Sequence, residues 1–177
     1  LYRAGKLTNQ RKEIDTGLST WNLAMGSEEL YDWIRENPGI FRPSDVDYVH
    51  APERIGRMKN VISINGGGEL DLMGQENAES AGSRQLSGTG GQLDFLEGAF
   101  RSQGGKGFVC INSSRVDKTG TRKSNIVAAI PGGSTVSAPR TMIQYVATEY
   151  GVVKLSGLSL LERAQAMISV AHPDFRE

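Results

Sequence analysis

The sequence is poor in the residue types that build a metal site, a disulfide framework or a membrane anchor. It has one cysteine and two histidines, His50 and His172, with no Cys/His spacing typical of a metal site. Cys110 cannot form an internal disulfide, and its apolar surroundings favour a buried structural thiol. No apolar stretch approaches the roughly 18 residues of a membrane span, and no signal peptide is visible. We therefore expect a cytoplasmic protein without metal or membrane contact.

Neither sign of charge is in excess, because 20 basic residues balance 20 acidic ones. Nucleic acids and anionic membranes both attract proteins with a basic excess, so neither is an expected partner. Hydrophobic residues make up 38% and charged residues 23%, which is ordinary for a folded domain. A chain of this length can bury about 70% of the surface that its unfolded form exposes, so a core can form without covalent staples.

Glycine is the residue type in excess, at 22 of 177 positions. There is no Gly-x-y period, which excludes a collagen helix. The glycines gather at 66–68, 88–91, 104–107 and 132–133, between apolar runs. Such clusters predict loops in which the backbone approaches another group closely.

The periodic segments predict an α/β fold, an open sheet of mixed or parallel strands with helices packed on it. Apolar residues at helical spacing predict helices from Ser27 to Asn37, over 93–100 and over 160–171, the last with a capping box at Ser159. Alternating or β-branched runs predict strands at 61–65, 69–74, 107–111, 125–130 and 142–148. Residues 40–57 contain two prolines and are expected to form a surface loop.

The glycine cluster at 88–91 leads directly into the predicted helix at 93–100. It partly matches the Gly-x-Gly-x-x-Gly dinucleotide fingerprint, but the third glycine is missing and no strand directly precedes it, so nicotinamide binding is disfavoured. Free N–H groups at a helix start can hold a phosphate, a carbonyl oxygen or an oxyanion. A turn that merely needs positive φ explains the same glycines equally well.

Carboxylates near the glycine clusters are candidate nucleophiles or acid/base groups, and they are Glu69, Asp71, Asp94 and Glu149. The simpler interpretations are favoured for each. We expect Glu69 and Asp71 on the wet face of a strand, Asp94 in the first turn of a helix and Glu149 in a turn at a strand end. His172, before Pro173, is interpreted as a satisfied residue at a helix end.

Several segments, in order, resemble the acetyl-CoA hydrolase/transferase family, in particular its 4-hydroxybutyrate and butyryl-CoA:acetate CoA-transferase branch. They lie at 61–65, 69–75, 88–95, 148–152 and 171–176. The resemblance covers nearly the whole chain and corresponds to the C-terminal half of those enzymes. It implies one half of a two-domain CoA-transferase, with residues 1–25 as a connector from an N-terminal domain and residues 26–177 as the C-terminal domain.

The resemblance also implies a substrate and a mechanism. Enzymes of this family move coenzyme A from a short-chain acyl-CoA to a free carboxylic acid, through a glutamyl-CoA thioester. The nucleophilic glutamate lies in a His-Thr-Glu motif before the segment that resembles residues 1–5, and residue 1 is Leu rather than Met. We therefore expect a piece of a longer enzyme, inactive by itself, whose partners are its N-terminal domain and further copies in a homo-oligomer.

Residue by residue, the resemblance assigns Gly90 and Gly91 to the loop that faces the reacting thioester and its oxyanion. The residues that it implies contact CoA are Gly68, Gly88, Thr89, Gly90, Gly91, Gln92 and Lys118. Two alternatives remain open, an acyl-CoA hydrolase of the same fold, in which water replaces the acceptor acid, and a non-catalytic CoA-binding module.

Overall fold

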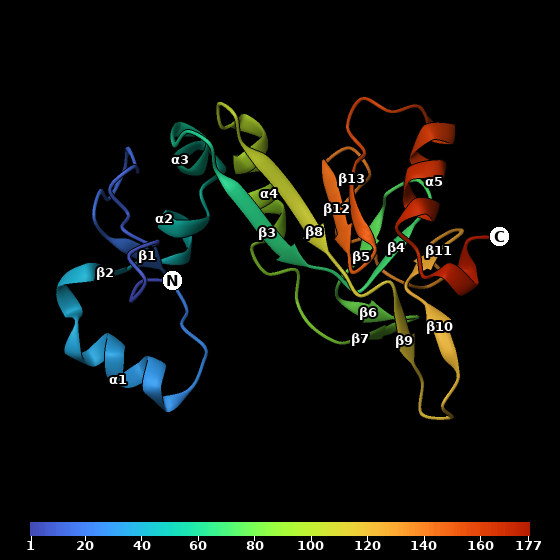
Figure 1. Cartoon of the computed structure of the whole chain (residues 1–177), viewed down its shortest axis with the longest axis horizontal. Coiled ribbons are helices and arrows are strands. Elements are labelled where there is room, and N and C mark those ends of the chain that lie inside the picture. Colours follow the sequence, from blue (N-terminus) through green and yellow to red (C-terminus); the bar gives the residue numbers. More distant parts are fainter.

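The computed structural model describes residues 1–177, and the chain runs from an N-terminal part, through a central sheet, to the C-terminal helix (Figure 1). The elements of the N-terminal part are β1 (Ser19–Trp21), α1 (Glu28–Glu36), η1 (Pro38–Ile40), β2 (Phe41–Pro43), α2 (Val46–His50) and α3 (Pro52–Arg57). None of the helices in the chain has the length and hydrophobicity needed to cross a membrane.

Helix α1 forms where the sequence predicts it. The Ser27 hydroxyl accepts a hydrogen bond from the N–H of Leu30, and two glutamates lie in the first turn, where the helix dipole favours negative charge. Trp33 packs edge-on against Phe41, with ring centroids 5.0 Å apart. This contact fixes α1 beside the parallel pair of β1 and β2.

The expectation of a loop over residues 40–57 is wrong, because this segment holds β2, α2 and α3. Pro52 occupies the first turn of α3, where its missing N–H costs nothing and its fixed φ suits a helix. Pro43 is the last residue of the short strand β2. Both prolines therefore mark element ends.

A buried carboxylate joins the connector segment to these two short helices. Asp15 accepts hydrogen bonds from Thr20 (2.9 Å) and from the Tyr48 hydroxyl (3.1 Å). It also forms ion pairs with Arg42 and Arg54, and its side chain is 3% exposed. Asp15 thus links the segment 8–22 to α2 and α3, and the two arginines compensate its buried negative charge.

The central sheet has the strand order β13-β12-β8-β3. Its strands are β3 (Ile62–Gly66), β8 (Lys106–Cys110), β12 (Tyr145–Thr148) and β13 (Gly151–Lys154). The first three are parallel, and β13 is antiparallel at one edge. The predicted open α/β sheet is confirmed, and β13 is the one strand of this sheet that the sequence analysis did not predict.

Short strands extend the fold beyond this sheet. They are β4 (Glu69–Asp71), β5 (Glu76–Asn77), β6 (Ser80–Ala81), β7 (Arg84–Gln85), β9 (Ser114–Val116), β10 (Arg122–Ser124) and β11 (Ile126–Val127). The strand predicted over 69–74 ends early because the Asp71 carboxylate accepts from the N–H groups of Met73 and Gln75, and Gly74 turns the chain at φ +83°. The strand predicted over 125–130 is reduced to two residues, which pair with β4.

Helices α4 (Gln92–Arg101) and α5 (Leu160–Ser169) pack on one face of the central sheet, and η2 (Pro173–Phe175) follows α5. Leu96 and Met167 meet Val109 and Val146 in a core with no exposed surface. The capping box predicted at Ser159 is confirmed.

The opposite face of the sheet has no helix of this chain on it, and Ile64 is 71% exposed there. Cys110 neighbours the buried Val109 along β8, so its side chain points to this open face and is half-buried. The expectation of a buried thiol is therefore wrong.

Candidate functional site

The loops after three parallel strands converge at the carboxyl edge of the central sheet, where ligands of open α/β folds bind. A surface hollow of about 430 Å³ lies there, lined by Gly67 after β3, by Cys110 to Asn112 at and beyond the end of β8, and by Thr148 at the end of β12. Glu149 accepts from the N–H (2.9 Å) and the hydroxyl (2.6 Å) of Ser113. Those hydrogen bonds from Ser113 lower the pKa of Glu149. Glu149 thus ties two loops together, in keeping with its interpretation as a turn residue.

Two other carboxylates do not occupy the places that the sequence predicts. Glu69 and Asp71 were expected on a wet face, but Asp71 is buried and Glu69 is largely covered. Asp71 caps the turn after β4, and Glu69 lies 3.6 Å from Arg115. The expectation is wrong because the turn after β4 encloses the Asp71 carboxylate, to which the N–H and the side-chain amide of Gln75 both donate.

Asp94 and His172 take the structural roles that the sequence predicts. Asp94 lies in the first turn of α4. His172 precedes η2, and its Nδ1 accepts from the N–H of Asp174 at 3.3 Å.

Glu76 on β5 is a functional candidate that the sequence analysis missed. Its side chain has no exposed surface, one carboxylate oxygen accepts from the amide of Gln92, and the other has no hydrogen-bond partner. Burial raises its pKa to about 7, while the hydrogen bond from Gln92 opposes that rise. A Cβ on Gly67 would lie 2.4 Å from the unpartnered oxygen, so glycine at 67 leaves space for this carboxyl. Nothing in the local pattern Gln75-Glu76-Asn77 marks the middle residue as buried.

The glycine cluster before α4 forms an exposed loop with free donors. Residues 85–90 are exposed, and no backbone N–H of residues 88–91 donates a hydrogen bond within the chain. Gly90 has φ +57°, a conformation that glycine adopts without strain. Gly91 precedes the helix, and its carbonyl accepts from the N–H of Phe95. The arrangement offers several N–H groups at a helix start to a negatively charged or carbonyl oxygen.

A cavity of about 350 Å³ brings other predicted site residues together. Its lining includes Gly68, Glu69, Leu86 and Arg115. Gly68 is therefore in a cavity, and Leu86 brings the start of the glycine loop to its rim, whereas residues 88–92 do not line it. Arg115 is the one cation of the lining, and sequence reasoning did not single it out.

Lys118 lies outside this cavity, in the exposed turn between β9 and β10. That turn is organised by Asp117, whose carboxylate accepts from Thr119 and pairs with Lys123 at 2.9 Å. The Thr119 hydroxyl and Lys123 hold the pKa of Asp117 well below its usual range. Lys118 forms no ion pair, so its ammonium group is available to an external anion.

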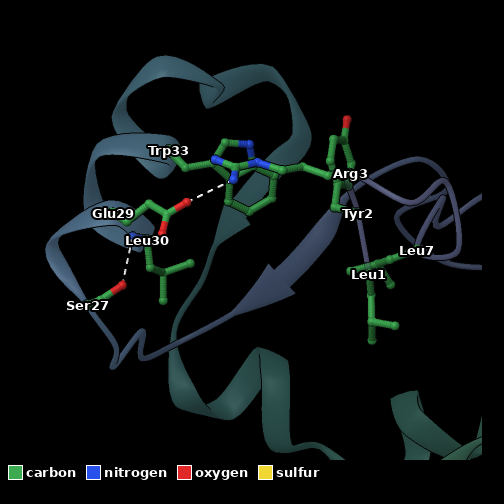
Figure 2. Close-up of a pocket in the computed structure, with 8 residues that line it drawn as sticks. All are labelled: Leu1, Tyr2, Arg3, Leu7, Ser27, Glu29, Leu30 and Trp33. Atoms are coloured by element: carbon green, nitrogen blue, oxygen red, sulfur yellow. Dashed lines mark hydrogen bonds and ion pairs between the residues drawn. The ribbon is translucent and has the colours of Figure 1, made fainter.

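A separate apolar pocket of about 410 Å³ lies in the N-terminal part, between residues 1–7 and α1 (Figure 2). Leu30 and Trp33 of α1 face the pocket, and Arg3 pairs with Glu29 at 2.8 Å at its rim. This pocket is lined by residues between Leu1 and Trp33 and lies on a different part of the chain from the glycine loop at 88–91. The chain also has no group of three or more His, Cys, Asp or Glu side chains that could hold a metal ion.

Comparisons with known proteins agree on one family. A family model described as the acetyl-CoA hydrolase/transferase C-terminal domain matches residues 26–177. Over 177 residues the chain is 45% identical to a butyryl-CoA:acetate CoA-transferase of Anaerostipes caccae, and over 178 aligned residues 42% identical to a 4-hydroxybutyrate coenzyme A transferase of Clostridium kluyveri. The crystal structure of RipA from Yersinia pestis superposes on 99% of the chain with a TM-score of 0.87 at 45% identity.

The chain is shorter than all three of these proteins. It spans 40% of the length of each of the two curated relatives and 39% of the RipA chain. The aligned region thus corresponds to less than half of each relative.

Proposed function

The chain belongs to the acetyl-CoA hydrolase/transferase family as its C-terminal domain, and from that membership we propose that it serves an enzyme that moves CoA from a short-chain acyl-CoA to a free carboxylate. The observation that carries the proposal is the 45% identity to a butyryl-CoA:acetate CoA-transferase across all 177 residues. Butyryl-, 4-hydroxybutyryl- and acetyl-CoA are the proposed donors. The rest of the enzyme, an N-terminal domain, supplies the nucleophile.

The proposed reaction proceeds through covalent intermediates on a glutamate outside this chain. The glutamate carboxylate attacks the thioester carbonyl and releases CoA thiolate, which leaves an acyl-glutamyl anhydride. The thiolate then attacks the glutamyl carbonyl, which releases the carboxylate product and leaves a glutamyl-CoA thioester. The acceptor carboxylate attacks this thioester and releases CoA thiolate, which leaves a new acyl-glutamyl anhydride. The thiolate then attacks the acyl carbonyl of that anhydride, which forms the new acyl-CoA and frees the glutamate carboxylate. Dividing the transfer in this way is nucleophilic catalysis.

Each of these steps passes through a tetrahedral oxyanion, and the chain's contribution is to stabilise it. We assign this role to the N–H groups of Gly90 and Gly91. Their lack of partners within the chain and their position before α4 support the assignment. Glycine at 90 permits the φ of +57° and leaves no side chain between the backbone and a substrate.

CoA itself is proposed to lie along the same side of the domain. The contacts assigned to it are Gly68, Gly88, Thr89, Gly90, Gly91, Gln92 and Lys118. The cavity at Gly68 adds Arg115, whose guanidinium group suits a phosphate oxygen better than an ammonium group does. The unpaired Lys118 supports an outer phosphate contact.

The proposal is tested with the full-length protein by intact mass spectrometry after mixing with butyryl-CoA. A transferase gains the mass of one CoA held as a thioester and loses it when acetate is added, while acetyl-CoA appears. The second candidate, an acyl-CoA hydrolase, follows from the description of the matched family. A hydrolase releases free CoA and makes no acetyl-CoA from added acetate. A protein that neither carries the adduct nor consumes the acyl-CoA is a binding module, and the proposal is then wrong.

A further inference from the structure

We propose that His50 is a positioning residue that sets the place of the glycine loop by packing its imidazole directly against the backbone of Gly91. His50 is the last residue of α2, and it lies 41 positions before the loop that it contacts. In giving the loop a part in the reaction, the inference rests on the proposed function.

The geometry at Gly91 explains why a glycine occupies that position. Its φ of −97° and ψ of 12° are open to any residue, so backbone conformation does not require glycine there. A Cβ at Gly91 would lie 2.3 Å from both Cε1 and Nδ1 of His50. Carbon atoms in contact normally keep roughly 3.5–4.0 Å apart. The imidazole therefore occupies the space that a side chain at 91 would need.

Position 90 requires glycine for a different reason, which is its backbone conformation. A Cβ at Gly90 would meet nothing within 4 Å, but φ is +57°. Substitution at 90 therefore strains the backbone whatever its neighbours, whereas substitution at 91 is opposed by one named side chain. This difference supplies a matched control within two adjacent residues.

Contacts with the first turn of α4 hold the His50 ring in place. Nδ1 lies 3.5 Å from Oδ2 of Asp94, and the ring packs against Phe95 with centroids 5.1 Å apart and planes at 65°. The His50 side chain is 17% exposed. The imidazole thus contacts Gly91, Asp94 and Phe95 together, so it fixes the start of α4 and the last donor of the loop as one unit.

Small displacements of such a unit have large kinetic effects. An error of about 1 Å in the position of a group that acts on the reacting centre can lower turnover by about 10²-fold. A residue that acts through the position of this loop lowers kcat by displacing the oxyanion donors, and because Gly88 to Gln92 are also proposed CoA contacts, the KM for acyl-CoA rises by a smaller factor.

The test is a reciprocal substitution in the full-length enzyme, with variants Gly91→Ala, His50→Ala and the two combined. We expect Gly91→Ala alone to lower kcat by about 10²-fold and His50→Ala alone by about tenfold. In the His50→Ala background the new methyl group enters vacated space, so Gly91→Ala should cost less than about threefold there. Gly90→Ala should cost the same factor in both backgrounds, within about twofold.

A second readout keeps this inference separate from the proposed function. Hydrogen exchange of the amides at 95–98, where the hydrogen bonds of α4 begin with Phe95 donating to the Gly91 carbonyl, should accelerate in Gly91→Ala and return toward the wild-type rate in the double variant. If the enzyme has no transferase activity but exchange shows this rescue, the proposed function fails and the packing role of His50 stands. If Gly91→Ala has the same effect in the wild-type background as in the His50→Ala background, in both kinetics and exchange, the inference is wrong. His50→Asn, which removes the ring but keeps a polar group, replaces His50→Ala if the latter does not fold.

Discussion

Replacing Glu76 by Gln should make the stability of the chain less dependent on pH. The carboxyl is fully buried, accepts one hydrogen bond from Gln92 and leaves its other oxygen without a partner. Glutamine has nearly the same shape, offers a carbonyl oxygen to Gln92 and carries no charge at any pH. The variant therefore removes the free-energy cost of ionising a buried group, while the shape of the side chain and the hydrogen bond from Gln92 are retained.

The magnitude follows from the pKa, which burial raises from 4.5 to about 7. That difference corresponds to about 3 kcal/mol of folding free energy. Because the folded-state pKa is raised, the stabilising contribution of the protonated carboxyl is fully present below pH 4.5. It declines as the pH rises and is gone once the pH has passed about 7.

The assay is urea unfolding of the wild-type chain and of Glu76→Gln at about pH 5 and about pH 8. The free energy of unfolding of the variant, relative to wild type, should rise by about 2–3 kcal/mol between the two conditions. Subtracting the wild-type value from that of the variant at each pH cancels the contributions of groups present in both proteins, such as Glu149, whose pKa is lowered. Glu36, exposed at the end of α1, provides the control, and Glu36→Gln should show no comparable change. A difference between Glu76→Gln and wild type that stays constant with pH would refute the reasoning.

Four further predictions concern the loops around the site. Gly90→Ala should lower the turnover of the full-length enzyme by roughly 10²–10³-fold, as loss of one oxyanion donor does, and unchanged steady-state kinetics would remove that role. Glu149→Gln should destabilise the chain near neutral pH. Because Ser113 holds the pKa of Glu149 low, the difference in stability between the variant and wild type should vanish as the pH falls through that lowered pKa, which thermal unfolding at a series of pH values would show. Gly67→Ala should lower the free energy of unfolding by about 1–3 kcal/mol, because the new Cβ lies below 3.0 Å from Glu76 and from two core side chains. Urea unfolding should show a smaller loss when Gly67→Ala is made in a Glu76→Ala background. Arg115→Ala should raise the KM for acyl-CoA about tenfold with little change in kcat, and an unchanged KM would show that the Gly68 cavity does not take the phosphates.

The elements that the sequence predicts well are those whose signals are local. Helix α1 begins after the cap Ser27, α5 after its capping box at Ser159, and β3 and β8 follow β-branched or apolar runs. In each case the information lies within a few neighbouring residues. The ordered motifs also led to the correct family, which the match over residues 26–177 confirms.

The parts that the sequence does not predict depend on contacts between distant segments. Glu76 lies in a polar run and is buried because residues distant in the sequence, among them Gly67, Gln92 and Ala138, pack around it. The alternating pattern places Asp71 on a wet face, but the residue is buried, in a strand that also pairs with the distant β11. The contact of His50 with Gly91 joins segments 41 residues apart, and no periodicity or motif reports it.

The buried Asp15 has a consequence for how motion passes through the molecule. Its hydrogen bond from Tyr48 and the contact of His50 with Gly91 are made from the same five-residue helix, α2, by side chains two residues apart. A tilt of this helix shifts both contacts at once. Segment 8–22 and the glycine loop are therefore both attached to α2, so the packing of each depends on the position of one short helix.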